Sequence, residues 1–367
     1  MQEFLARLWR GLVAHVDAPL LLITLLLMAA GLPTVYSATY DANSHLVPQM
    51  LNMAIGLCAM WAVAQLPPQK LMRFGVPLYL LGVVLLILVF FFGIKVNGAR
   101  RWLSLGFTRI QPAELLKIAV PLMLAWYFHK HEAVLKFRHY IVASLLLLVP
   151  FALIAKQPDL GTAILVGAAG FYVIFFAGLP WRVIVGLVAV ASAAAPFVWT
   201  MLHDYQRKRI LTLIDPTTDP LGSGYHIIQS TIAIGSGGKL GKGWLEGTQT
   251  HLEFIPERHT DFILAVFSEE RGLLGNSILL LLYLLLIGRG LLIAGKASTL
   301  FGRVLAGSVT LSFFTYVFVN MGMVSGILPV VGVPLPFMSY GGTALVTLSV
   351  GIGMLMSINT HRMLVRP

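Results

Sequence analysis

The sequence predicts an all-α polytopic membrane protein with about ten transmembrane helices and one large extracytoplasmic loop between spans 7 and 8. Of its 367 residues, 57% are hydrophobic and only 11% are charged, which is too apolar for a water-soluble core. Many apolar runs approach the roughly twenty residues that a helix needs to cross a bilayer. The alternating pattern of a membrane β-barrel is absent, so we expect helices and not strands.

The apolar runs divide the chain in order, and no separate soluble domain is visible within residues 1–367. We expect spans at roughly 18–37, 47–66, 74–94, 111–129, 138–155, 160–177, 181–202, 262–288, 302–327 and 341–359. The first run is long and lacks a small-residue cleavage site, which favours a retained signal-anchor. The segment 203–260 is the large loop within this single membrane domain.

Lys and Arg set the orientation. An even number of spans places both termini on one side of the membrane, and an excess of basic residues marks the cytoplasmic side. We therefore expect cytoplasmic N- and C-termini. The basic residues on that side are Arg7, Arg10, Lys70, Arg73, Lys130, Lys136, Arg138, Arg182, Arg289, Lys296, Arg303, Arg362 and Arg366.

Basic residues on the opposite side need an explanation. The short 95–110 loop carries Lys95, Arg100, Arg101 and Arg109, against the usual bias. An anionic ligand would explain them, and so would attraction to anionic lipid headgroups. The 203–260 loop is also basic. Its glycines permit tight turns and its apolar residues argue for packing, so we expect ordered re-entrant or interfacial pieces there.

Charged residues within or beside the predicted spans imply a hydrated interior, because a charge near the bilayer centre costs about 2.5–3.5 kcal/mol. Glu114 and Lys117 are three residues apart on one helix face and can neutralise each other. That pair is either structural or a place where Lys117 holds a substrate phosphate. Asp159 follows Pro158 and is well placed to cap the next helix.

A second group of charges precedes the eighth span. Asp261 stands at the water–lipid boundary, where Thr260 or Asp261 could simply cap the helix. Glu269 lies about 12 Å further along, too deep for simple solvation. We expect Glu269 to pair with Arg271, Lys117 or another inward cation.

Segment 326–342 is rich in proline and glycine and uncharged. Its composition fits a packed lid or a pore loop equally well.

Four strings occur together in one order. They are residues 157–163 (Gln-Pro-Asp-Leu-Gly-Thr-Ala), 241–244 (Gly-Lys-Gly-Trp), 256–262 (Pro-Glu-Arg-His-Thr-Asp-Phe) and the proline-rich segment that ends at 339–342 (Ser-Tyr-Gly-Gly). They resemble the motifs of the SEDS family, and the resemblance covers nearly the whole chain. The 241–249 region resembles the RodA branch more than FtsW. We expect Lys242 and Trp244 to order this loop rather than to act in catalysis.

The resemblance implies an inverting peptidoglycan glycosyltransferase that polymerises lipid II during cell elongation. Asp261 stands at the position of the family's essential outer-loop aspartate. One general base suffices, because a pyrophosphate leaving group departs without a proton. The leaving group instead needs positive charge, which Arg101, Lys117, Lys156 and basic residues of the large loop such as Arg258 could supply.

The resemblance also suggests how the remaining groups act. Glu114 and Asp159 would organise the cations. No dedicated metal motif is present, so a divalent cation, if one is used, would be held by the substrate pyrophosphate and a carboxylate. No other cofactor is expected.

Partners and location follow from the same resemblance. They are lipid II and the nascent glycan, a class B penicillin-binding protein with transpeptidase activity, other membrane proteins of the elongation complex, and membrane lipids, but no nucleic acid. The protein would lie in the bacterial inner membrane with its active site on the periplasmic side. Two alternatives stay open: a flippase for lipid-linked precursors, which a charged cavity would also serve, and a scaffold for a transpeptidase.

Overall fold

The computed structural model describes residues 14–361, apart from 41, 97–98, 105, 107–108, 203, 220–221, 253 and 255–256. The terminal cations Arg7, Arg10, Arg362 and Arg366 lie outside the described residues, as does Pro256.

Ten long helices in the described part of the chain coincide with the ten predicted spans, which confirms the predicted fold class. Eight are long and apolar enough to cross a membrane. Of the other two, α5 contains charged residues and α7 has 17 residues. The ten are α2 (Ala18–Thr39), α3 (Val47–Ala64), α4 (Pro68–Phe92), α5 (Pro112–Lys130), α6 (Phe137–Lys156), α7 (Leu160–Phe176), α8 (Trp181–Met201), α12 (Ile263–Lys296), α13 (Leu300–Val324) and α14 (Thr343–Thr360).

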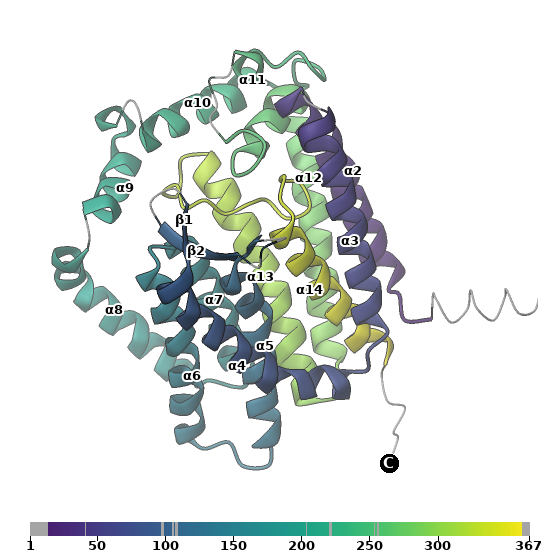
Figure 1. Ribbon diagram of the computed structural model, residues 1–367, viewed down its shortest axis with the longest axis vertical. Helices are drawn as coiled ribbons and strands as arrows, with labels where there is room; N and C mark the ends of the chain where they lie inside the picture. Colours follow the sequence, from purple (N-terminus) through teal and green to yellow (C-terminus); the bar gives the residue numbers. More distant parts are fainter. Residues whose placement is uncertain are drawn as a thin grey trace, which may run out of the picture.

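Helix α13 forms the centre of the bundle and α8 its edge (Figure 1). In the most apolar 18-residue stretch of each helix, 67% of the residues are buried in α13 and 61% in α14. No residue of α8 is buried. A helix with no buried face is stable in lipid, because lipid tails solvate apolar side chains. Along the left side and top of Figure 1, α9 (Asp204–Ile214), α10 (Ser223–Ser236) and α11 (Thr248–His251) arch from α8 towards α12. We call this the loop end.

The link between α4 and α5 is a small antiparallel sheet, which the sequence analysis did not predict. β1 (Ile94–Val96) pairs with β2 (Ala99–Ser104), which pairs with β3 (Arg109–Ile110). Strands this short carry too little alternation to be recognised. They are possible because the link lies outside the hydrocarbon-spanning helices, where water can satisfy open strand edges. The sheet positions Arg101 on β2.

Helix α12 is interrupted at Gly272, whose φ of 62° and ψ of −161° are not helical. Loop residues 237–243 are inserted at this break. A Cβ on Gly272 would lie 2.3 Å from the Gly241 nitrogen, so only glycine permits this approach. Four backbone hydrogen bonds join loop and helix: Leu273 N to Gly238 O (2.9 Å), Leu274 N to Lys239 O (3.0 Å), Lys242 N to Glu269 O (3.0 Å) and Gly243 N to Glu270 O (3.2 Å).

The proline-rich segment 326–342, whose composition fits a packed lid or a pore loop, is packed against its neighbours. Val333, Leu335, Phe337 and Met338 are buried. Helices α12 and α3 and the 257–261 turn hold its backbone through these bonds: Tyr283 Oη to Pro336 O (2.7 Å), Gln49 Nε2 to Ser339 O (3.1 Å), Gly341 N to Gln49 Oε1 (3.2 Å) and Tyr340 N to His259 O (2.8 Å).

Candidate active site

Asp261 lies in the turn just before α12, and the simple capping explanation is wrong. The N-cap position is Phe262, and no side chain caps the helix. Thr260 Oγ1 donates instead to the backbone oxygen (3.2 Å) and carboxylate (3.0 Å) of Glu257. The Asp261 carboxylate is therefore not engaged in holding the helix terminus.

The surroundings of Asp261 favour its protonated form. The residue is only partly exposed, and among the residues that the structure describes no hydrogen bond or ion pair engages its carboxylate. Burial, and then the negative charge of Glu257, raise the pKa of Asp261 to about 6. Such a pKa suits a general base that works near neutral pH.

Two groups that the sequence analysis missed hold Asp261 from outside its own segment. Asn320 of α13 donates from Nδ2 to the Asp261 backbone oxygen at 2.8 Å and to the Val333 oxygen at 2.7 Å. Gly332 lies against the carboxylate, since a Cβ there would be 3.2 Å from Asp261 Oδ2. The available signal was a lone asparagine within the apolar 302–327 run.

Asp159 caps α7 as predicted and also organises its neighbours. Its Oδ1 accepts from Thr162 N at 3.2 Å, and its Oδ2 accepts from Gln111 Nε2 at 3.0 Å. Arg101 Nη1 lies 3.9 Å from Oδ2, and Arg101 Nη2 donates to Pro158 O. Within the described chain, Arg101 Nε is buried and has no hydrogen-bond partner, so the contacts of this guanidinium leave one donor unsatisfied.

Glu114 and Lys117 form the predicted ion pair on α5, with 2.6 Å between Glu114 Oε1 and Lys117 Nζ. Their side chains are 12% and 8% exposed, so the two charges are largely withdrawn from solvent. Lys117 Nζ also lies 5.3 Å from the ring centroid of Tyr316 on α13. Tyr316 is one turn from Asn320, and therefore neighbouring residues on one face of α13 contact Lys117 and the Asp261 backbone.

Segment 326–342 links these groups. A Cβ on Gly161, near the start of α7, would lie 2.7 Å from Val331 O, while the next residue, Gly332, faces Asp261. Arg101, Asp159, Glu114, Lys117 and Asp261 are thus gathered around this segment and the adjoining part of α13.

Two candidate residues point elsewhere. Lys156, exposed at the end of α6, lines a cavity together with Val198 of α8. Arg258 donates from Nε to Ala38 O and from Nη1 to Thr250 O (3.2 Å). These contacts favour a role for Arg258 in holding α2 and α11 to the 257–261 turn.

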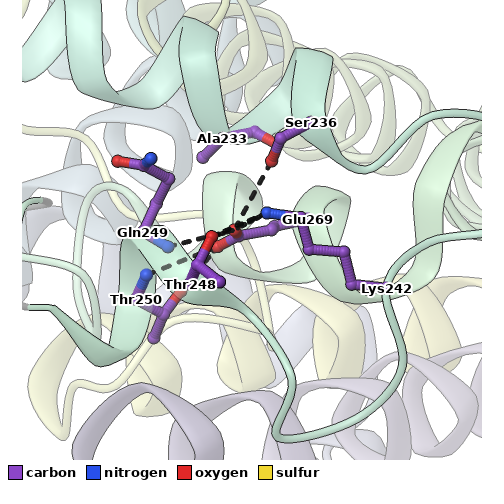
Figure 2. A network of polar contacts seen from close by, with 7 residues as sticks. All are labelled: Ala233, Ser236, Lys242, Thr248, Gln249, Thr250 and Glu269. Carbon is purple, nitrogen blue, oxygen red and sulfur yellow. Dashed lines mark hydrogen bonds and ion pairs between the residues drawn. The ribbon is translucent and has the colours of Figure 1, made fainter.

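Glu269 pairs with Lys242 of the inserted loop, not with Arg271 or Lys117. Lys242 Nζ lies 2.7 Å from Glu269 Oε1, and the Glu269 side chain is fully buried. Figure 2 shows how loop groups converge on this carboxylate. Its other donors are Ser236 Oγ (3.4 Å), Thr248 Oγ1 (3.2 Å), Gln249 N (3.0 Å), Thr250 N (3.3 Å) and Thr250 Oγ1 (3.3 Å).

The Lys242 and Trp244 contacts agree with the expectation of loop ordering. Lys242 Nζ also donates to Thr248 Oγ1 (2.8 Å), and Trp244 Nε1 donates to Pro33 O of α2 (3.3 Å). Both side chains hold loop pieces together.

Comparison with known proteins identifies the family. The model of the FtsW/RodA/SpoVE cell cycle proteins matches residues 14–364. The chain belongs to this family, the SEDS proteins. It is 52% identical over 349 residues to the peptidoglycan glycosyltransferase MrdB of Escherichia coli, a match that covers 95% of this chain and 94% of MrdB. It is also 36% identical to a probable peptidoglycan glycosyltransferase FtsW of Geobacter metallireducens, covering 95% and 96% of the two chains.

Solved structures agree with the SEDS assignment. A crystal structure of the rod shape determining protein RodA of Thermus thermophilus is similar with a TM-score of 0.71 at 29% identity, covering 95% of this chain and 97% of that one. A structure described as coordinating polymerization and crosslinking by a peptidoglycan synthase complex is similar with a TM-score of 0.82 at 35% identity, covering 95% and 98%.

Proposed function

We propose that this SEDS protein is a peptidoglycan glycosyltransferase that polymerises lipid II into glycan strands during cell elongation, with Asp261 as its general base. The observation that carries the proposal is the Asp261 carboxylate, which is partly exposed, has no ion-pair partner among the described residues and has a pKa raised to about 6. The name peptidoglycan glycosyltransferase that relatives over 95% of the chain carry, printed as probable for FtsW, supports the proposal.

The reaction balances with one base. As the acceptor sugar's 4-hydroxyl attacks the donor's anomeric carbon, its proton passes to the Asp261 carboxylate and the new C–O bond forms. The bond from the anomeric carbon to the polyprenyl pyrophosphate breaks, and its electron pair leaves on the pyrophosphate. That anion needs positive charge rather than a proton.

Arg101 and Lys117 are the cations best placed to hold the pyrophosphate. Each lies beside a carboxylate that orients it, Asp159 for Arg101 and Glu114 for Lys117. Lys156 is a weaker candidate, because it faces the cavity towards α8. Among the described residues no cluster of three or more metal-ligating side chains occurs. A divalent cation would therefore enter with the pyrophosphate and share one carboxylate.

The membrane orientation follows from the distribution of Lys and Arg among the loops, and the partner follows from the similar peptidoglycan synthase complex. The protein would lie in the bacterial inner membrane with cytoplasmic termini and the loop end on the periplasmic side, where the 203–260 segment and Asp261 meet the substrate. Its partners would be lipid II, the nascent glycan, membrane lipids, a class B penicillin-binding protein that crosslinks the product, and other elongation-complex proteins. The description of the similar complex, which joins polymerization to crosslinking, supports the transpeptidase.

The test is polymerisation of lipid II by purified wild-type protein and Asp261→Asn, each alone and with the cognate transpeptidase, with crosslinking inhibited. We expect glycan from the wild type and none from the variant, with both proteins fully folded under the assay conditions. Thr260→Val is the matched control, because the hydrogen bonds of its hydroxyl within the described chain go to Glu257 and not to Asp261. Equal polymer from both proteins would remove Asp261 as the base. No polymer from either, even with the partner, would favour the flippase or scaffold alternatives.

A further inference from the structure

Asn320 is a fully buried amide in the middle of the site. Two backbone carbonyl oxygens, of Asp261 and Val333, lie within hydrogen-bond distance of one end of the amide. Both oxygens are acceptors, so the Nδ2 end of the amide must face them. Both N–H bonds of Nδ2 are thereby used. No other side-chain group of this size offers two donors in one plane without a charge.

The two bonds join the backbone of Asp261 to the segment that lies against its carboxylate. One bond holds the backbone of Asp261 itself. The other holds Val333, and thereby Gly332, which approaches Asp261 Oδ2 closely enough that a Cβ would lie only 3.2 Å away. Gly332 has a φ of 73°, a conformation that glycine adopts without strain.

We propose that Asn320 is a positioning residue for the glycosyl transfer, clamping the 257–261 turn to segment 326–342 so that the Asp261 carboxylate stays shielded beside Gly332. The proposal rests on the function proposed for Asp261. Without the clamp the turn and the segment separate, water reaches the carboxylate, and the desolvation that raises its pKa is lost. The base then becomes weaker and less well aligned with the acceptor hydroxyl.

The test compares Asn320→Leu, which removes both donors at similar volume, with the wild type. Initial rates of lipid II polymerisation are measured from about pH 5 to pH 9. We expect kcat to fall about 10- to 100-fold with KM changed less than about twofold, and the acid limb of the pH profile to move down by about one unit. A purely structural role would lower the amount of folded protein but would not move the acid limb.

Ser308→Ala is the matched control. Ser308 lies three turns away on α13, is fully buried, and donates to the Ala169 backbone oxygen at 2.7 Å. Like Asn320→Leu, this change removes a buried hydrogen bond that a side chain of α13 donates to a backbone carbonyl. Because the bond does not reach Asp261, the acid limb should stay in place. If Asn320→Leu does not accumulate, Asn320→Ser provides the same readout, because it is smaller and keeps one donor.

An Asn320 variant with the wild-type kcat and acid limb would overturn the proposal, as would a fall in kcat with no change of the limb. Asp261→Asn is run alongside. If Asp261→Asn is inactive while the Asn320 variant behaves like the wild type, only the positioning role has failed. If Asp261→Asn polymerises normally, the proposed base has failed.

Discussion

Replacing Lys242 by Met tests whether the buried Glu269 carboxylate orders the inserted loop. The change removes the cation 2.7 Å from a fully buried carboxylate while keeping most of the side-chain volume. Breaking a buried pair costs about 3–5 kcal/mol. The Lys242 side chain is 28% exposed and Glu269 keeps its hydroxyl and backbone donors, so we expect a smaller cost of about 2 kcal/mol for the local structure.

Hydrogen exchange of the amides in segment 240–252 measures this cost directly. Gln249 N and Thr250 N donate to Glu269, so their exchange reports opening of the loop. A loss of about 2 kcal/mol corresponds to exchange about 30-fold faster. The control is Lys208→Met, whose partner Asp219 lies at a similar 2.9 Å but whose own side chain is 63% exposed. Exchange in segment 240–252 of Lys242→Met is compared with exchange around Lys208 in Lys208→Met. Equal acceleration in the two variants would show that burial of Glu269 does not strengthen its pair with Lys242.

Two further predictions concern charge. The folded-state pKa of Asp261, about 6, lies above the ordinary value of 3.8, so stability from the protonated carboxyl is lost as pH rises through about 6. Asp261→Asn should therefore raise the melting temperature at about pH 8 but not at about pH 4, and equal shifts at both would contradict the assignment. Lys117→Met leaves Glu114 buried without its cation and should lower both stability and turnover, the latter at least about tenfold. Adding Glu114→Gln should restore stability alone, and unchanged turnover and substrate affinity in Lys117→Met would exclude a role at the phosphate.

The helices could be predicted because lipid leaves the backbone few choices. The 138–155 span, for example, is observed as Phe137–Lys156. The eighth span was placed too short, at 262–288, since α12 extends to Lys296. In the structure Arg289 pairs with Asp17 at 2.6 Å, and α12 continues to Lys296. A cation neutralised by a residue far away in the sequence does not terminate a helix.

The same distinction separates the predictable and unpredictable parts of the site. The Glu114–Lys117 pair and the Asp159 cap are local, so their spacing predicts them. The Lys242–Glu269 pair spans 27 residues and the Asn320–Asp261 bond spans 59, and no periodicity relates these positions. The break at Gly272 was also hidden, because its cause is the backbone of a loop that lies earlier in the chain.

The distribution of charge explains how such a site can exist beside a membrane. Arg101 and Lys117 each lie beside a carboxylate, so neither cation must be buried alone. A pyrophosphate arriving at the site would compete for those cations. Among the described residues the buried Glu114 Oε2 has no hydrogen-bond partner, so Lys117 satisfies only one of the two Glu114 oxygens. Asp261 is held differently, through its backbone oxygen, and no cation of the described chain pairs with its carboxylate. A nearby cation would lower its pKa and weaken it as a base. Separating the phosphate-binding cations from the base is therefore a chemical requirement of the proposed reaction, and the fold meets it by placing segment 326–342 between α7 and Asp261.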